Sequence, residues 1–486
     1  MHRKNSQTLF QSLKPAVLAA AVFSTMPGWV STASAADGEG LASPRLLLAA
    51  SDAGDDGIGS RDELFGDDAD LPKAEAESQA KPAAAGSGIK GYLQFEMART
   101  ISEPVHWSKM LTRAELGSQG NLGNGIKWKL GARVDYDAVH DLYDFYPSDV
   151  KDDQRFNLYL RENYLDISAN DWDFRLGKQN VVWGEMVGLF FADVVSARDM
   201  REFILPEFDA MRIPQWAARA EYFKDDFHAE LLWIPVASYD EIGESGAEFY
   251  PYQPTQPGVG VTYRNEDIPA RTIANSNYGL RLSTLKNGWD MSGFLYSSMD
   301  VTPTFYRDLS SSPGTIVYEA RHDRIDQAGG TLAKDFGSIV LKAEAVYTHG
   351  RQFTVLRLDD SNGVVPQNTL DWAVGLDFDL PSDTRLNVQM FQRAFFDYDP
   401  GLISDRHENG YSLLVSHKFT DKLDAQVTWI SSLNRTDWLF RPRMTWQFER
   451  NWRLAAGVDV FNGPAYGLFG RYDANDRVYS EVRYNF

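Results

Sequence analysis

Hydrophobic and polar residues alternate along most of the chain after residue 88, with the period of two that a β-strand imposes. The clearest stretch is 126–138. Its apolar positions are Ile126, Trp128, Leu130, Ala132, Val134, Tyr136 and Ala138. Its polar positions are Lys127, Lys129, Gly131, Arg133, Asp135 and Asp137. The last residues of the chain alternate in the same way and end on Phe486. Both stretches predict strands with one apolar and one polar face.

Further strands are predicted wherever the alternation returns. The ranges are 172–179, 216–222, 227–233, 278–285, 339–347, 370–380, 386–393, 411–419, 423–429, 438–448 and 452–460. Short turns are predicted at 224–226, 286–288, 335–337, 381–383, 420–422 and 449–451. They alternate with long polar segments at 139–153, 180–214, 237–276, 300–322, 350–368 and 398–407. An alternation of short turns with long loops is typical of outer-membrane barrels, which place the turns in the periplasm.

We therefore predict an all-β protein, a transmembrane antiparallel β-barrel of about 18 strands with long extracellular loops and short periplasmic turns. An even number of strands places both ends of the barrel on the periplasmic side, so residues 462–476 are assigned to the last outer loop. An edge strand in a soluble sheet is the alternative for the C-terminal stretch. In the barrel, Leu93, Phe95 and Met97 face outward.

The N-terminal region predicts that the chain is exported. Arg3, Lys4 and Lys14 precede an apolar run at 16–23 and the small residues 33–35, a pattern that predicts a signal peptide over residues 1–35. Residues 36–88 are rich in Ala, Gly, Ser and Asp and predict a disordered acidic periplasmic arm, followed by the barrel at 89–486. The predicted location is the outer membrane of a Gram-negative cell. There is no cysteine, and the net charge of −20 argues against a nucleic-acid partner.

The membrane fixes which face of each strand is wet, because a Lys or Arg facing lipid at mid-depth costs about 2–4 kcal/mol. The charged face must therefore line the lumen. The lumen candidates are Arg133, Asp135, Arg175, Arg219, Glu221, Arg281, Lys342, Glu344, Asp377, Arg393, Arg443, Arg453, Asp459, Glu481 and Arg483. Such charges either set a transverse field that orients solutes or pair across neighbouring strands.

The segment 180–214, counted as the third outer connection of the barrel, is the candidate constriction. In porins a loop at this position folds into the channel, whereas a loop resting on the outer rim is the alternative. Residues 196–205 have helical character, and Pro206 would end the helix. The constriction candidates are Trp183, Glu185, Asp193, Arg198, Asp199, Arg201 and Glu202.

Enzymatic chemistry is not predicted. The histidines show no metal-ligand spacing, and Ser416 and His417 are adjacent strand residues that point to opposite faces, so they cannot act as nucleophile and base. We expect no catalytic residues, no metal site and no cofactor. Acidic pairs such as Asp359 and Asp360 are better suited to holding divalent cations with lipopolysaccharide.

Five segments resemble an outer-membrane family labelled domain of unknown function 1302. They are 161–166, the stretch RLGKQNVVWGE at 175–185, 193–199, 212–216 and 469–479. The resemblance implies a wide barrel that handles hydrophobic compounds or lipids alongside an exporter of the resistance-nodulation-division type. We accordingly expect a channel for a hydrophobic or amphipathic molecule or lipid, and the charged lumen face keeps a porin for small polar or anionic solutes as the alternative. The expected partners are outer-membrane lipid and lipopolysaccharide, the barrel assembly machinery through the C-terminal strand, and a periplasmic protein through the acidic arm.

Overall fold

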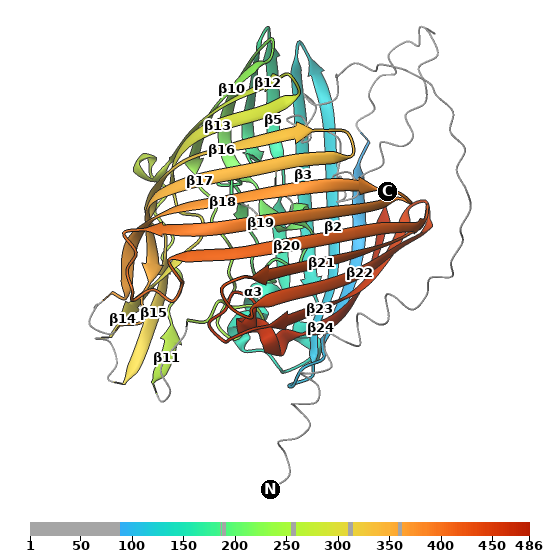
Figure 1. Ribbon diagram of the computed structural model, residues 1–486. Helices are drawn as coiled ribbons and strands as arrows, with labels where there is room; N and C mark the ends of the chain where they lie inside the picture. The colour runs from blue at the N-terminus through green and yellow to red at the C-terminus, as the bar shows by residue number, and fades with distance from the viewer. Residues whose placement is uncertain (1–87, 185, 187–190, 254–258, 310–313, 358–361) are drawn as a thin grey trace. The chain divides into compact units, whose positions relative to one another are not determined.

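The wall of the protein is one antiparallel sheet that closes on itself (Figure 1). The computed structural model describes residues 88–184, 186, 191–253, 259–309, 314–357 and 362–486. Strand β1 (Lys90–Thr100) pairs with β2 (Trp107–Gly123) on one side and with the last strand, β24 (Arg477–Asn485), on the other. The first and last strands therefore complete the barrel.

The other wall strands follow in chain order. They are β3 (Ile126–Asp137), β4 (Phe156–Leu160), β5 (Asn163–Ala169), β6 (Trp172–Gln179), β9 (Gln215–Lys224), β10 (Phe227–Val236), β12 (Asn277–Lys286), β13 (Trp289–Met299), β16 (Arg324–Asp335), β17 (Ile339–Thr354), β18 (Val364–Leu380), β19 (Thr384–Phe396), β20 (His407–Thr420), β21 (Leu423–Ser432), β22 (Trp438–Glu449) and β23 (Trp452–Asn462). Both β4 and β5 pair with β3, so they are two halves of one interrupted strand. The wall thus has 18 strands, and the predicted fold class is confirmed.

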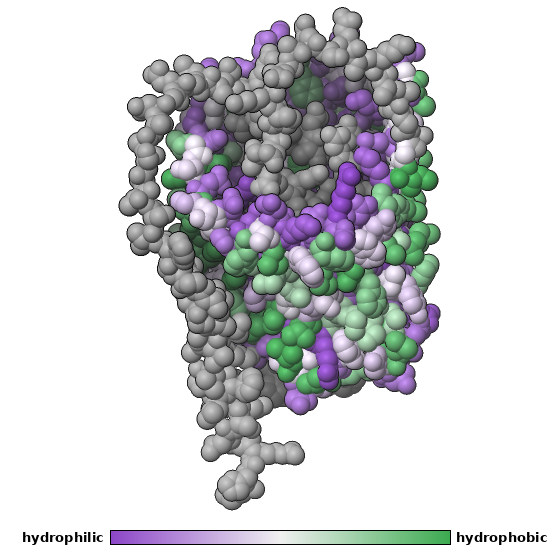
Figure 2. Space-filling model, turned by 90° about the vertical axis from the view of Figure 1, so that its right-hand side faces the viewer, coloured by the Kyte–Doolittle hydropathy of each residue, from purple (hydrophilic) through white to green (hydrophobic). Residues whose placement is uncertain are grey.

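Side chains alternate between the two faces of the wall as the sequence predicted. On β3, Leu130 and Tyr136 are exposed on the outer face, whereas Arg133 and Asp135 are almost fully buried inside. On β1, Leu93 is exposed and its neighbours in the chain are buried polar residues. Figure 2 shows hydrophilic residues around the hollow of the barrel and hydrophobic patches on its outer wall. This arrangement matches a barrel with an apolar environment outside and a wet interior.

Short turns join the strands at one end of the barrel. Asn124, Asn170, Asp225 and Asn287 have φ between 52° and 56° in these turns. Asn and Asp tolerate the left-handed conformation, which gives two-residue hairpin turns a twist that matches the flanking strands. Local sequence is therefore sufficient to place this end of the barrel.

The long connections gather at the opposite end. They contain α2 (Val139–Leu142), α3 (Ser148–Gln154), η3 (Ile273–Asn275), η4 (Gly470–Asn475) and a separate sheet of β11 (Gly260–Tyr263), β15 (Thr315–Arg321) and β14 (Thr304–Asp308). Residues from three connections share one hydrophobic cluster that includes Val150, Tyr250 and Tyr318. The connections therefore pack on one another. Among the described residues, no helix is long and apolar enough to cross a membrane.

The predicted long loop at 350–368 is wrong in its extent. Strand β17 continues to Thr354 and β18 begins at Val364, with a register shift between Thr348 and Arg351. Pairing extends because the hairpin continues beyond the barrel rim and meets β14, where the Arg307 N–H donates to the Asn362 carbonyl. The polar composition of 350–368 predicted a loop, because the parts of β17 and β18 beyond the barrel rim lack the apolar outer face of the other strands. The signal-peptide and arm predictions, and Asp359 and Asp360, lie outside the described residues.

The terminal residue takes part in closing the barrel. The Phe486 N–H donates to the Gly91 carbonyl at 2.9 Å, and the Gly91 N–H donates to the Phe486 carbonyl at 3.0 Å. Deleting Phe486 should lower the unfolding free energy by about 1–3 kcal/mol, the loss expected for two hydrogen bonds. Urea unfolding of the refolded protein measures this. Phe486→Ala keeps both backbone bonds and should lose less, and equal losses would contradict the hydrogen-bond explanation.

Candidate functional site

Residues 180–214, here called the inner segment, connect β6 to β9, and those of them that the structure describes lie against inward-facing side chains of the wall. The segment begins and ends at one place, because Gln179 pairs with Gln215. Val181 and Trp183 pack in a hydrophobic cluster with Leu232 of β10 and with residues of β13 and β17. The Trp183 indole N–H also donates to a Glu230 oxygen at 3.1 Å. The first part of the segment is thus fixed to one side of the barrel.

Glu344 of β17 holds the next part through backbone donors. Its carboxylate accepts the N–H of Met186 at 2.7 Å and the N–H of Ala192 at 3.1 Å. Glu344 is 3% exposed, so its charge is satisfied by these N–H groups within the barrel and not by bulk water. A single carboxylate of the wall therefore holds the inner segment at two points, Met186 and Ala192.

A small hairpin forms the middle of the segment, where the sequence had predicted a helix at 196–205. Strands β7 (Ala197–Arg198) and β8 (Arg212–Ile213) pair with each other, and α4 (Phe208–Met211) lies between them. The helix prediction is wrong because side chains of this stretch bind partners that a continuous helix would not bring together, either two residues away or on the wall. Arg201 binds Asp199 at 2.7 Å and reaches the Tyr159 hydroxyl of the wall. Such contacts outweigh a helix propensity of a few tenths of a kcal/mol per residue.

The far end of the segment binds the opposite side of the barrel through two acids. Glu202 pairs with Lys109 of β2 and with Arg477 of β24, the latter at 3.1 Å. Glu207 accepts hydrogen bonds from arginines on three consecutive strands, β22 to β24. The segment therefore reaches from the β10 and β17 side of the wall to the β22–β24 side.

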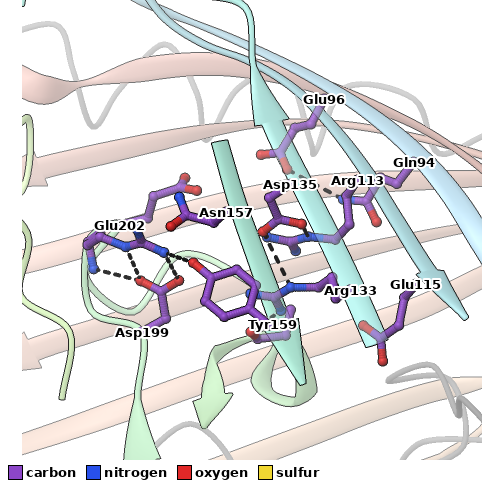
Figure 3. A network of polar contacts seen from close by, with 12 residues as sticks. Gln94, Glu96, Arg113, Glu115, Arg133, Asp135, Asn157, Tyr159, Asp199 and Glu202 are labelled. Atoms are coloured by element: carbon purple, nitrogen blue, oxygen red, sulfur yellow. Dashed lines mark hydrogen bonds and ion pairs between the residues drawn. The ribbon is translucent and has the colours of Figure 1, made fainter. Parts of the chain in front are cut away.

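The wall beside these acids is a dense polar network (Figure 3). Asp135 lies between two arginines, accepting two hydrogen bonds from Arg113 at 2.8 Å each and a contact from Arg133 at 3.3 Å. Arg133 also donates to the Ala210 carbonyl of the inner segment at 2.7 Å. Charges of the wall and of the segment thus form one connected network.

The predicted constriction residues are spread along the inner segment, with Trp183 against the β10 side of the wall and Glu202 against the β2 and β24 side. Trp183, Asp193, Arg198, Asp199, Arg201 and Glu202 all lie in the inner segment and contact the wall or each other. Glu185 lies outside the described residues. Their role in narrowing a channel stays a prediction. Glu207 was not among the predicted residues, and no pattern in the sequence beside it points to the wall arginines that it binds.

The predicted lumen residues pair mainly across neighbouring strands. Arg175 binds Asp166 and Arg393 binds Asp371 across neighbouring strands, each at 2.6 Å, whereas Arg219 binds Glu221 of its own strand at 2.8 Å. Arg281 faces Glu230 across the β10–β12 pair. Arg443 and Arg453 bind Glu207, each at 3.0 Å. These contacts are ion pairs, and an effect of the same charges on the orientation of solutes stays a prediction. Within the described residues, no group of three or more His, Asp or Glu side chains could hold a metal ion.

Acid should weaken the contact at Glu202. Burial opposes ionisation of this carboxyl, but Lys109 and Arg477 outweigh burial and lower its pKa from 4.5 to about 2. Because the folded-state pKa is depressed, the stabilisation is complete above pH 4.5 and is lost as the pH falls toward 2. Glu202→Gln should therefore cost about 2–3 kcal/mol of unfolding free energy at pH 7. Urea unfolding should show the gap to the wild type closing in acid, and a gap independent of pH would contradict this.

The comparisons found one matching family and several similar solved structures. No curated protein matches the chain. OmpF of Salmonella typhi, in complex with daunomycin, aligns with a TM-score of 0.41 and 9% identity over 82% of this chain and 97% of that one. OmpT of Vibrio cholerae, folded in vitro, aligns with a TM-score of 0.39 and 12% identity over 83% of this chain and 100% of that one. The family model described as Protein of unknown function (DUF1302) matches residues 117–486, and the chain therefore belongs to that family.

Proposed function

We propose that the protein is an outer-membrane channel for small polar or anionic solutes, closed in this conformation by the inner segment. The observation that carries the proposal is the inner segment itself, which is held inside the barrel by charged groups on opposite sides of the wall. A closed wall with an apolar outer face and a charged interior is the arrangement that lets a barrel span a membrane around a water-filled path.

The outer face supports the membrane location. Leu116, Leu231, Leu295 and Met390 are each about half exposed at outward positions on strands that lie around the wall. In water, apolar exposure on this scale would be costly, whereas in a bilayer it is the favourable state. The same proposal includes the outer membrane as the location and the barrel assembly machinery and lipopolysaccharide as partners. It assigns the chain no enzymatic activity.

The anchors of the inner segment are suited to a closure that can be reversed. Glu344 binds backbone N–H groups, and Glu202 and Glu207 bind cationic side chains. Water can replace any of these contacts, and an anionic solute can take the place of Glu202 or Glu207 beside their cationic partners. Release of the inner segment therefore exchanges partners and leaves no buried charge unpaired. A purely apolar plug would lack this property.

Transfer of a hydrophobic or amphipathic molecule is the second candidate, because one apolar cluster includes the start of the inner segment and another includes its middle. One contains Trp183, Leu232 and Phe294, and the other contains Phe203, Leu205 and Phe461. If the segment moved aside, both clusters would expose apolar wall to the cargo. A periplasmic exporter acting through residues 36–88 belongs to this hypothesis.

Conductance of the refolded chain in a planar bilayer tests the proposal. The measurement is made on the chain with and without residues 36–88. From both forms we expect brief ohmic openings that carry small ions. Openings that appear only after removal of residues 36–88 would show that this arm, and not the inner segment, closes the channel. Permanent silence of both forms, together with uptake of a hydrophobic dye into liposomes that contain the protein, would favour the second candidate.

A further inference from the structure

Three arginines on the wall converge on one carboxylate of the inner segment. The arginine triad consists of Arg443 of β22, Arg453 of β23 and Arg483 of β24. Glu207 Oε1 accepts from Arg443 Nη2 and Arg453 Nη2, each at 3.0 Å, and Oε2 accepts from Arg483 Nη1 at 3.4 Å. Charge-assisted hydrogen bonds from guanidinium groups are the contacts that select carboxylates. The triad therefore has the chemistry of a carboxylate receptor.

The wall around the triad is positively charged without the inner segment. The inward faces of β22, β23 and β24 carry Arg441, Arg443, Arg453, Arg477 and Arg483, but the buried acids on these strands are Asp459 and Glu481. Asp459 is occupied by Arg441 at 2.8 Å and by Arg477 at 2.9 Å. Glu481 pairs with Arg453 at 2.9 Å. Glu207 adds a further negative charge beside these arginines.

We propose that the arginine triad is the binding site for the carboxylate group of a transported anion, and that Glu207 occupies this site as a tethered competitor when the channel is closed. This inference rests on the proposed channel function and names its solute class. Because Glu481 already neutralises part of the triad, the site favours a single carboxylate over a group with two negative charges.

The small space beside Glu207 indicates that a solute carboxylate replaces the Glu207 side chain and does not bind next to it. A cavity of about 40 Å³ lies beside Glu207, with Arg443 and Arg483 of the triad on the wall side and Leu205, Pro206 and Ala210 on the segment side. This volume holds one or two water molecules but not an organic anion. Within the described part of the chain, the buried Nε–H of Arg443 has no hydrogen-bond partner, so the triad offers a donor that Glu207 does not use. An incoming carboxylate must displace the Glu207 side chain.

The triad is held in place by the wall and not by Glu207. The guanidinium of Arg483 stacks over the Tyr92 ring, with its Cζ 3.6 Å from the ring centroid. Glu481 holds Arg453 from the neighbouring strand. Removing the Glu207 carboxylate should therefore leave the three arginines aimed at the same point. A prearranged receptor of this kind binds a free ligand without a large ordering cost.

Calorimetric titration of the refolded full chain with propionate tests the site, because propionate matches the end of a glutamate side chain. Propionamide is the neutral control ligand. A tethered competitor acts at an effective concentration of millimolar or more, so Glu207→Gln should bind propionate at least about tenfold more tightly than the wild type. Asp209→Asn is the matched variant, since Asp209 pairs within the segment, with Arg212 at 3.1 Å, and not with the triad. It should bind propionate as the wild type does.

Equal propionate affinity in Glu207→Gln and the wild type, or equal binding of propionamide, would overturn the inference. Arg443→Lys provides an independent test if Glu207→Gln does not fold. This variant keeps the charge but loses the planar pair of donors, so propionate affinity should fall, and an unchanged affinity would also overturn the site. Titration does not depend on conduction. Propionate binding in a chain that carries no current would retain the site and reject the channel, and current without propionate binding would do the reverse.

Discussion

Replacing residues 183–211 with a short Gly-Ser turn should convert the closed barrel into a permanently open channel. The replacement removes the groups that reach the β22–β24 side, including Glu202 and Glu207, and leaves Glu344 without its backbone donors. The wall itself should be retained, because β7 and β8 pair with each other and not with the barrel sheet. We expect a conductance several-fold above that of the wild type in a planar bilayer, ohmic and without closures.

The geometry of the wall makes this replacement practicable. Gln179 and Gln215 are paired residues at the ends of β6 and β9, so a turn of a few residues can join them. Replacing residues 268–275 of the outer connection with the same Gly-Ser sequence is the control, and it should leave the current unchanged. An equally small current from both variants would show that the inner segment is not what closes the barrel.

Much of the wall could be predicted because short stretches of sequence determine the strands and turns of a β-barrel. Alternation fixes which side chains face outward, as Leu130 and Arg133 illustrate on one strand. Turn residues such as Asn287 fix where a hairpin reverses. Both signals lie within a few residues of each other, so strand number, phase and the closure by the last strand follow without knowledge of distant contacts.

The interior could be predicted only in part, because its contacts join residues far apart in the chain. Glu207 and Arg483 are separated by 276 positions, and nothing in the sequence around either one identifies the other. The prediction of a helix at 196–205 failed for the same reason, since Arg201 is held by the distant residue Tyr159. The alternation of polar and apolar positions placed Arg443 and Arg453 among the lumen candidates, but it could not say that a single carboxylate from the inner segment binds both.

Burial of so many charges inside the barrel has a structural consequence. A buried ion pair adds little net stability compared with an apolar pair of the same size, but loss of one partner costs several kcal/mol. Asp135, held between Arg113 and Arg133, is such a case. The network therefore fixes the position of the inner segment more than it strengthens the wall. Stability of the wall should come from strand pairing and from the environment of its outer face.

Leu231→Lys should reveal that environment by destabilising the protein in a bilayer by about 2–4 kcal/mol. Leu231 lies in the middle of β10, is 52% exposed, and has the exposed aromatic residues Phe227 and Trp233 on either side of it along the same outer face. Aromatic residues at the two interfaces and an aliphatic residue between them are typical of a strand that spans the apolar layer. A lysine at this position would place a charge in lipid with no water within reach. Urea unfolding of the protein folded into liposomes measures the loss.

Ile273→Lys is the matched control for this substitution. Ile273 is 78% exposed in η3 of the outer connection between β10 and β12, so the same change there exchanges an apolar for a charged side chain in water. Its effect on the unfolding free energy should lie within about 0.5 kcal/mol of zero. If Leu231→Lys were as harmless as Ile273→Lys, the outer face of β10 would not lie in lipid, and the membrane location would be wrong. A large loss at Leu231 alone would instead locate the apolar layer at the middle of the barrel strands, because the two sites differ in their surroundings and not in the chemistry of the substitution.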